Sequence, residues 1–155
     1  GEYIIYTSQA LRNKAFGSAL DFAWSAIGTG DFAIRESISK IKTFRNFKEH
    51  KTVKPPISAA EGLFGGHLLA VRGADCVVFL DWAEGAFIRK IDVVPTQIFW
   101  NETGDGSVAV HDTVSRLYTD SVGYGFSMPQ CFFFFTLRFC FISIDFLVLD
   151  AEMNY

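Results

Sequence analysis

The sequence predicts an all-β fold made of a repeated unit of four short strands, with about three units in the chain. Short apolar runs rich in Val, Ile, Phe and Trp are punctuated by Gly or Pro, a pattern typical of strands and unfavourable for helices. One aromatic run also recurs, because Phe22-Ala23-Trp24 is matched in character by Gly62-Leu63-Phe64 and by Ile98-Phe99-Trp100. Their last residues are 40 and 36 residues apart, which indicates a repeat of about 40 residues.

The first predicted unit has four strands joined by turns. Its strands are Phe22 to Trp24, Phe32 to Ile34, Lys40 to Phe44 and Lys51 to Lys54. The turn after the first strand contains Gly28, and the third strand alternates polar and apolar residues as a half-buried strand does. Pro55-Pro56 follows the fourth strand, where the chain crosses to the next unit and needs no ladder N–H.

The second unit repeats this order, and the third repeats most of it. The expected strands are Gly62 to Phe64, Leu68 to Val71, Val77 to Trp82 and Phe87 to Asp92 in the second unit, and Ile98 to Trp100, Val108 to Val110 and Ser115 to Tyr118 in the third. The run from Val77 to Leu80 is continuously apolar, which predicts a strand covered on both faces. The units therefore span roughly residues 18–56, 57–94 and 95–120, and four strands in about 40 residues predict a partial WD40-type β-propeller.

A helix competes with strands only near the beginning of the chain, at Ser8 to Lys14. This segment can form a short helix or a strand-to-strand connection that comes from a preceding unit. We favour the connection, because the flanking runs have the character of strands.

Composition places the chain among folded proteins and away from nucleic-acid binders. Half of the residues are apolar and 16% are aromatic, which is enough to bury a core, and the net charge of −3 gives no field that attracts phosphate. Cys76, Cys131 and Cys140 match neither a disulfide framework nor a zinc site, so we expect reduced thiols in a cytosolic protein. No secretory leader opens the chain at Gly1, and the glycosylation sequon that begins at Asn101 is therefore discounted.

No residue pattern indicates catalysis or a bound cofactor. His50, His67 and His111 lack the spacing of metal ligands, and no nucleophile stands beside a candidate base. The glycines around Asp105 and Tyr124 are expected in turns, because neither group opens a helix after a strand as a phosphate-binding loop does. We expect no enzyme activity, no cofactor, no metal ion and no small-molecule substrate.

A basic stretch between Arg35 and Lys54 is the one candidate interaction patch, and it holds seven of the 14 Lys and Arg residues. The candidate residues are Lys40, Lys42, Arg45, Lys48 and Lys51. Lys40 and Lys42 alternate with Ile41, so a strand would place both lysines on one face. The stretch is either a solvated edge that discourages strand pairing or a surface for an anionic membrane or an acidic partner.

Several segments in order carry a resemblance to a known family. They are Gly1 to Thr7, Leu11 to Ala19, Phe32 to Ser37, Lys40 to Lys42, Asn46 to Glu49, Gly65-Gly66 with Leu68-Leu69, Asp81-Trp82, and Ile88 to Ile91. Across roughly residues 1–118 the chain resembles the beta-prime family of COPI vesicle coat (coatomer) subunits, within the second of its two WD-repeat propellers. The repeats are degenerate, because Gly66-His67 lies only 15 residues before Asp81, too close to be its ordinary Gly-His partner.

The resemblance implies a scaffold and protein-interaction module of the COPI coat, in protein transport between the Golgi and the ER. It implies other coatomer subunits as partners, especially the alpha subunit, and a cytoplasmic location with peripheral association to Golgi and vesicle membranes. The net charge of −3, for its part, argues against a nucleic-acid partner. The family recognises dilysine cargo through its first propeller, which has no counterpart here, so no cargo-binding residue is carried over.

The tail, residues 121–155, departs from the resemblance. Its apolar run, residues 131–149, has the length of a membrane span but contains Arg138 and Asp145, each costing about 2.5 to 3.5 kcal/mol at the centre of a bilayer. A nonfunctional truncated product is a weaker interpretation of the whole chain than a scaffold. For the tail itself three alternatives stay open: a tail anchor, strands within Phe139 to Leu149 that close the third unit, and an altered C-terminus from a truncated or misspliced gene. We favour the last.

Overall fold

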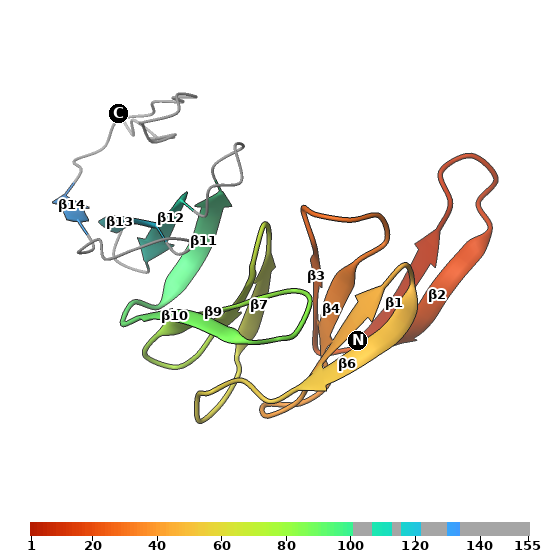
Figure 1. Ribbon diagram of the computed structural model, residues 1–155, viewed down its shortest axis with the longest axis horizontal. Coiled ribbons are helices and arrows are strands. Elements are labelled where there is room, and N and C mark those ends of the chain that lie inside the picture. The colour runs from red at the N-terminus through yellow and green to blue at the C-terminus, as the bar shows by residue number, and fades with distance from the viewer. Residues whose placement is uncertain (101–106, 113–115, 122–129, 134–155) are drawn as a thin grey trace. The chain divides into compact units, whose positions relative to one another are not determined.

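The computed structural model describes residues 1–100, 107–112, 116–121 and 130–133, and its regular elements there are all β-strands. The chain forms two compact units, Gly1–Val94 and Pro95–Tyr155 (Figure 1). The described residues form three four-stranded antiparallel sheets and one two-stranded sheet. The predicted all-β architecture of successive four-stranded units is confirmed.

The chain opens with a hairpin of β1 (Glu2–Tyr6) and β2 (Asn13–Ser18). The loop of residues 7–12 joins the two strands: the amide of Thr7 donates to the carbonyl of Arg12 at 2.9 Å, and Leu11 turns the backbone with a φ of 47°. The expected strand-to-strand connection is therefore confirmed, and a helix over Ser8 to Lys14 is wrong. The reason is local, because hydrogen bonding across the turn brings two strands together and leaves no room for a second helical turn.

The first four-stranded sheet follows the predicted order. Its strands are β3 (Asp21–Trp24), β4 (Phe32–Arg35), β5 (Ile41–Arg45) and β6 (Lys48–Val53), paired as β3-β4-β5-β6. The turn between β5 and β6 has two residues, Asn46 and Phe47, with φ of 48° and 64°. Two positive φ angles in succession match the twist of a tight hairpin, so the turn sets the register of these strands.

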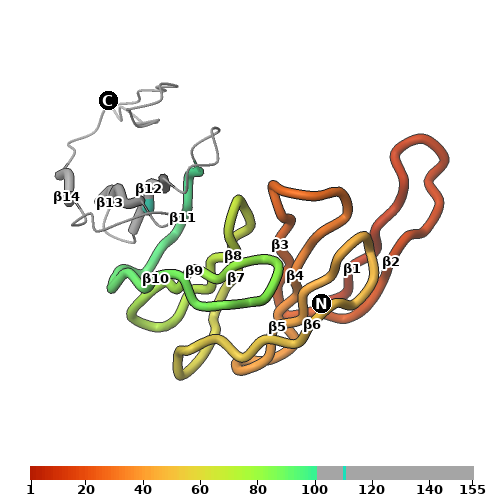
Figure 2. Tube along the Cα trace, viewed as in Figure 1, coloured from red at the N-terminus to blue at the C-terminus, as the bar shows by residue number. Residues whose placement is uncertain are grey.

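The second sheet has the same order, traced in Figure 2. Its strands are β7 (Gly62–Gly65), β8 (Leu69–Arg72), β9 (Val77–Leu80) and β10 (Phe87–Ile91). Every residue of β9 is fully buried, as its continuously apolar sequence predicts. Both sheets thus end on an outer strand that pairs on one side only, β6 and β10.

The third sheet contains a strand that the sequence analysis did not predict. It consists of β11 (Pro95–Trp100), β12 (Ser107–Asp112), β13 (Arg116–Ser121) and β14 (Gln130–Phe133). β14 pairs with β13 and lies inside the stretch that we assigned to the tail. The run Cys131 to Phe135 has no alternation that marks it as a strand, because apolar residues fill it without a break. Most of the apolar run 131–149, including Phe139 to Leu149, lies outside the described residues.

Strands β3, β4 and β5 are covered on both faces, whereas β6 is largely exposed. Ala23, Ala33 and Ile41 face one hydrophobic cluster, in which they pack with residues of the sheet β7–β10 such as Leu69 and Val78. The other face meets the β1–β2 hairpin in a second cluster, whose members are Ile5, Phe32 and Ile34 with Tyr3, Ala15, Ala19, Phe22, Phe44 and Phe47. Alternation along β3, β4 and β5 thus divides each of these strands between two cores.

Strands β3 and β7 approach each other at Gly65. A Cβ atom on Gly65 would lie far inside van der Waals contact with the backbone carbonyl of Trp24. Two links fix the approach: Asp21 accepts a hydrogen bond from the amide of Leu63 at 2.8 Å, and Ala26 donates to the carbonyl of Gly66 at 2.9 Å. The first two four-stranded sheets are therefore joined both by hydrogen bonds to backbone groups and by their shared hydrophobic core.

Candidate interaction surface

The five basic residues of the candidate patch lie along two neighbouring strands. Lys40 directly precedes β5, Lys42 and Arg45 belong to β5, and Lys48 and Lys51 belong to β6. Antiparallel pairing places Arg45 opposite Lys48 at the turn end of the hairpin. The patch is therefore continuous along the sheet, but its members meet different surroundings.

Lys40 and Lys42 have carboxylate partners in their own sheet. Lys40 forms an ion pair with Glu36. The Nζ atom of Lys42 lies 3.3 Å from Oε1 of Glu36 and 3.3 Å from Oε2 of Glu49. The hydrogen bond to Glu49, followed by the one to Glu36, raises the pKa of Lys42. Lys40, followed by Lys42, lowers the pKa of Glu36. These two lysines thus contribute little net positive charge to the surface.

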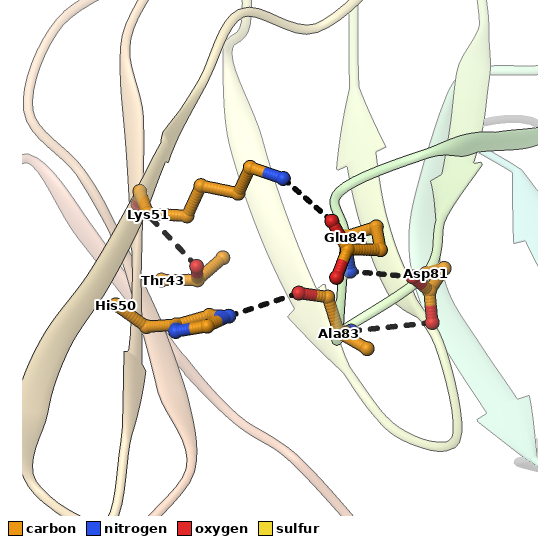
Figure 3. A network of polar contacts seen from close by, with 6 residues as sticks. All are labelled: Thr43, His50, Lys51, Asp81, Ala83 and Glu84. Carbon is orange, nitrogen blue, oxygen red and sulfur yellow. Dashed lines mark hydrogen bonds and ion pairs between the residues drawn. The ribbon is translucent and has the colours of Figure 1, made fainter.

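Lys51 belongs to a polar network between the first and second sheets, drawn in Figure 3. Its Nζ atom lies 2.7 Å from Glu84, and its backbone carbonyl accepts a hydrogen bond from Thr43 at 3.3 Å. The ring nitrogen Nε2 of His50 lies 3.0 Å from the carbonyl of Ala83, to which it donates when protonated. The hydrogen bond from the Lys51 ammonium group lowers the pKa of Glu84. Lys51 therefore links the first four-stranded sheet to the second.

Asp81 shapes the turn that presents Glu84. Its carboxylate accepts hydrogen bonds from the amides of Ala83 at 3.2 Å and Glu84 at 2.6 Å (Figure 3). The next residue, Trp82, is buried and donates from Nε1 to the carbonyl of Gly66 at 2.9 Å. The Asp-Trp pair thus stabilises a turn and a core contact within its own sheet, although the ordinary Gly-His partner is absent at this spacing.

Arg45 and Lys48 differ from the other three. Both are exposed, and within residues 1–100 no carboxylate forms an ion pair with either side chain. The structure adds a third cation, since Nζ of Lys14 lies 5.9 Å from the centre of the Phe47 ring, within the range of a cation–π contact. Lys14 comes from β2, more than 30 residues away in sequence, so the basic stretch alone could not reveal it.

Cys76 carries a free thiol away from the candidate patch. Cys76 is 2% exposed, and burial, with a hydrogen bond to Asp75, raises its pKa to about 11, which suppresses the reactive thiolate. In the part of the chain that the structure describes, no three His, Cys, Asp or Glu side chains gather as metal ligands would. None of these described residues forms a helix with the length and hydropathy that crossing a membrane requires.

Comparison with known proteins gives consistent matches. The profile of the COPA/B second beta-propeller family matches residues 1–122. Coatomer subunit beta'-2 of Oryza sativa subsp. japonica is 51% identical over 114 residues, which cover 73% of this chain and 12% of that protein. Coatomer subunit beta' of Rattus norvegicus is 51% identical over 105 residues, which cover 68% of this chain and 11% of that protein. The chain thus spans about an eighth of the length of the curated relatives it matches.

Proposed function

Because the chain belongs to the COPA/B second beta-propeller family, we propose that it forms part of the structural scaffold of a COPI vesicle coat. Membership rests on the match over residues 1–122 and confirms the resemblance seen in the sequence. The observation that carries the proposal is 51% identity to coatomer beta' subunits over about two thirds of the chain. We place the propeller part at residues 1–120 and the divergent tail at 121–155. The end of the family match near residue 122 supports that division, although β14 of the third sheet comes from the tail.

The role that we propose is to hold surfaces in fixed positions, without bond chemistry. Two hydrophobic cores pack on the two faces of strands β3, β4 and β5. The Lys51–Glu84 contact connects the outer strand β6 to the second four-stranded sheet. Such an arrangement presents turns and outer strands as preformed surfaces, which lowers the entropic cost of binding a partner. A coat needs this rigidity because its subunits must keep their geometry over a vesicle.

The partners that we propose are other coatomer subunits, especially the alpha subunit, at the cytoplasmic face of Golgi and vesicle membranes. The relatives' name, coatomer subunit, supports assembly with further coat subunits. The patch around β5 and β6 is our candidate contact surface, with Arg45 and Lys48 as its uncompensated part. Lys40, Lys42 and Lys51 belong to the same surface but are engaged by carboxylates of the chain itself.

Co-precipitation tests the proposal. The tagged chain is expressed in cells, and the alpha and beta coat subunits in the precipitate are measured. We expect both to be enriched over a tagged, unrelated propeller of similar size, and carbonate to release the chain from membranes. A chain that captures no coat subunit, or that stays in membranes through carbonate extraction as an anchored span does, would overturn the scaffold proposal.

A further inference from the structure

The turns that join β1 to β2, β3 to β4 and β5 to β6 gather at one end of the sheets, which we call the hairpin rim. The amide of Phe47 donates to the carbonyl of Gly30 at 2.9 Å, so the β5–β6 turn rests on the β3–β4 turn. The contact of Lys14 with Phe47 brings the β1–β2 hairpin to the same place. Figure 1 shows the β1–β2 and β3–β4 turns pointing to the same side.

The hairpin rim carries an excess of positive charge. Arg12, Lys14, Arg45 and Lys48 are all exposed, and among residues 1–100 none of the four forms an ion pair with a carboxylate. The carboxylate of Asp31 is directed at the backbone, where it accepts a hydrogen bond from the amide of Asn46 at 2.9 Å. The rim is therefore basic although the whole chain has a net charge of −3.

The same turns expose two aliphatic side chains. Leu11 is 74% exposed at the tip of the β1–β2 turn, and Ile27 is 46% exposed in the β3–β4 turn. Because both lie in turns, neither belongs to a strand face that a neighbouring sheet covers. Aliphatic tips surrounded by cations combine the two terms that hold a protein on an anionic bilayer, shallow apolar insertion and attraction to headgroups.

From this juxtaposition we infer that the hairpin rim docks on an anionic phospholipid surface, with Leu11 and Ile27 entering the interface and the four cations contacting headgroups. An acidic peptide would satisfy the cations but would leave the aliphatic tips in water, which is why the lipid surface fits better. The inference deepens the proposed function, on which it rests, by assigning a membrane-facing side to the scaffold.

Vesicle flotation tests the inference with matched pairs of variants. The 155-residue chain is mixed with phosphatidylcholine vesicles, with or without phosphatidylserine, because bound protein floats whereas aggregated protein sinks. Lys48→Glu is compared with Lys54→Glu. Lys48 begins β6 and Lys54 directly follows its other end, both lysines are exposed, and the two substitutions change the net charge equally. Ile27→Ser is compared with Ile38→Ser, since Ile38 is 59% exposed in the turn between β4 and β5, at the opposite end of the sheet.

We expect binding to the anionic vesicles only, weakened at high salt. Lys48→Glu should weaken binding by about fivefold or more, because a cation near an anionic bilayer contributes a factor of about five. Ile27→Ser should also weaken it several-fold, whereas Lys54→Glu and Ile38→Ser should bind like the parent. Circular dichroism confirms that each variant is folded.

Equal binding within each pair, or no binding by the parent chain, would overturn the inference. Weak binding by Lys48→Glu with normal binding by Ile27→Ser would also overturn it, because a purely electrostatic surface suits an acidic peptide. If the chain captures coat subunits but does not float with vesicles, the lipid inference fails and the scaffold proposal stands. If it floats with vesicles but captures no coat subunit, the scaffold proposal fails instead.

Discussion

At the scale of single residues, a glycine without a special backbone angle decides how closely two sheets pack. Gly65 looks like a turn residue in the sequence, but the structure puts it against the carbonyl of Trp24, where a methyl group has no space. Backbone cannot move aside as the end of a side chain can. The approach of β3 to β7 therefore depends on this one missing side chain.

Replacing Gly65 by alanine should force β3 and β7 apart and destabilise the chain by at least about 2 kcal/mol. The control is Gly73→Ala, whose added Cβ would meet Cys76 Sγ at 3.3 Å, a contact that small side-chain adjustments relieve. Urea unfolding of dilute protein, followed by tryptophan fluorescence, measures both variants. Equal stability of the two variants would show that the inner strands do not approach as closely as described.

Trp82 contributes a hydrogen bond as well as apolar surface. Trp82→Phe should cost about 0.5 to 1.5 kcal/mol of unfolding free energy for the lost hydrogen bond, because the Gly66 carbonyl loses one of its two donors and keeps the amide of Ala26. Trp24→Phe is the matched control, since Trp24 is 48% exposed and makes ring contacts with Phe22 and Phe32 that a phenyl ring can retain in part. The same unfolding assay should rank Trp82→Phe as the more damaging change, and the reverse order would contradict the core contact.

At the scale of strands and turns, most of the fold could be predicted from the sequence. The repeated aromatic runs and the intervening Gly turns gave the strands from β3 to β10 within a few residues, because hydrophobic pattern and turn chemistry are local. β14 was not predicted because the run after Gln130 is uniformly apolar, and such a run shows no alternation that would distinguish a strand. The helix alternative at Ser8 to Lys14 failed because pairing of β1 with β2 decides that segment.

The candidate patch could be predicted only in part, because contacts between residues that are distant in sequence decide which of its charges are neutralised. The five basic residues are evident in the sequence, but Glu84 lies 33 residues beyond Lys51 and neutralises it only in the folded chain. Lys14 joins Phe47 only because the β1–β2 hairpin packs on the sheet β3–β6. The sequence thus shows which residues are charged, and the fold decides which charges remain uncompensated.

The ion pair between Lys51 of β6 and Glu84 in the β9–β10 turn predicts that the stability of the fold depends on pH. Since the pKa of Glu84 is lower in the folded chain than in the unfolded chain, the contact stabilises the fold above the ordinary pKa of the carboxyl. That contribution is lost as the pH falls through the folded value. Carboxyl chemical shifts in NMR titrations should show the pKa of Glu84 return towards its ordinary range in Lys51→Met.

Lys90→Met is the control for this titration, because Lys90 pairs with Asp92 at 3.0 Å and not with Glu84. It should leave the pKa of Glu84 unchanged. High salt should reduce the difference between parent and Lys51→Met, because the Lys51–Glu84 pair is exposed and therefore screened. An unchanged pKa of Glu84 in Lys51→Met would mean that the link between the first and second four-stranded sheets does not form in solution.

At the scale of the whole molecule, apolar surface on the β1–β2 hairpin sets the behaviour of the isolated chain. One face of the hairpin packs through Ile5 and Tyr3 on the next sheet, while Ile4, Tyr6 and Phe16 on the other face are 53%, 53% and 74% exposed. Ile4 and Phe16 are direct cross-strand partners, so they form a continuous apolar surface. β1 also pairs on one side only, which leaves a strand edge open.

The central claim is that these sheets are successive units of a larger propeller, each of which needs a neighbour on both faces. Size-exclusion chromatography with light scattering, over a range of concentrations and beside a thermal melt, tests it most directly. We predict concentration-dependent association of the 155-residue chain, reduced by Ile4→Thr with Phe16→Thr, and a broad melt. A parent chain that remains a monomer at every concentration and melts in one sharp, cooperative transition would contradict the account.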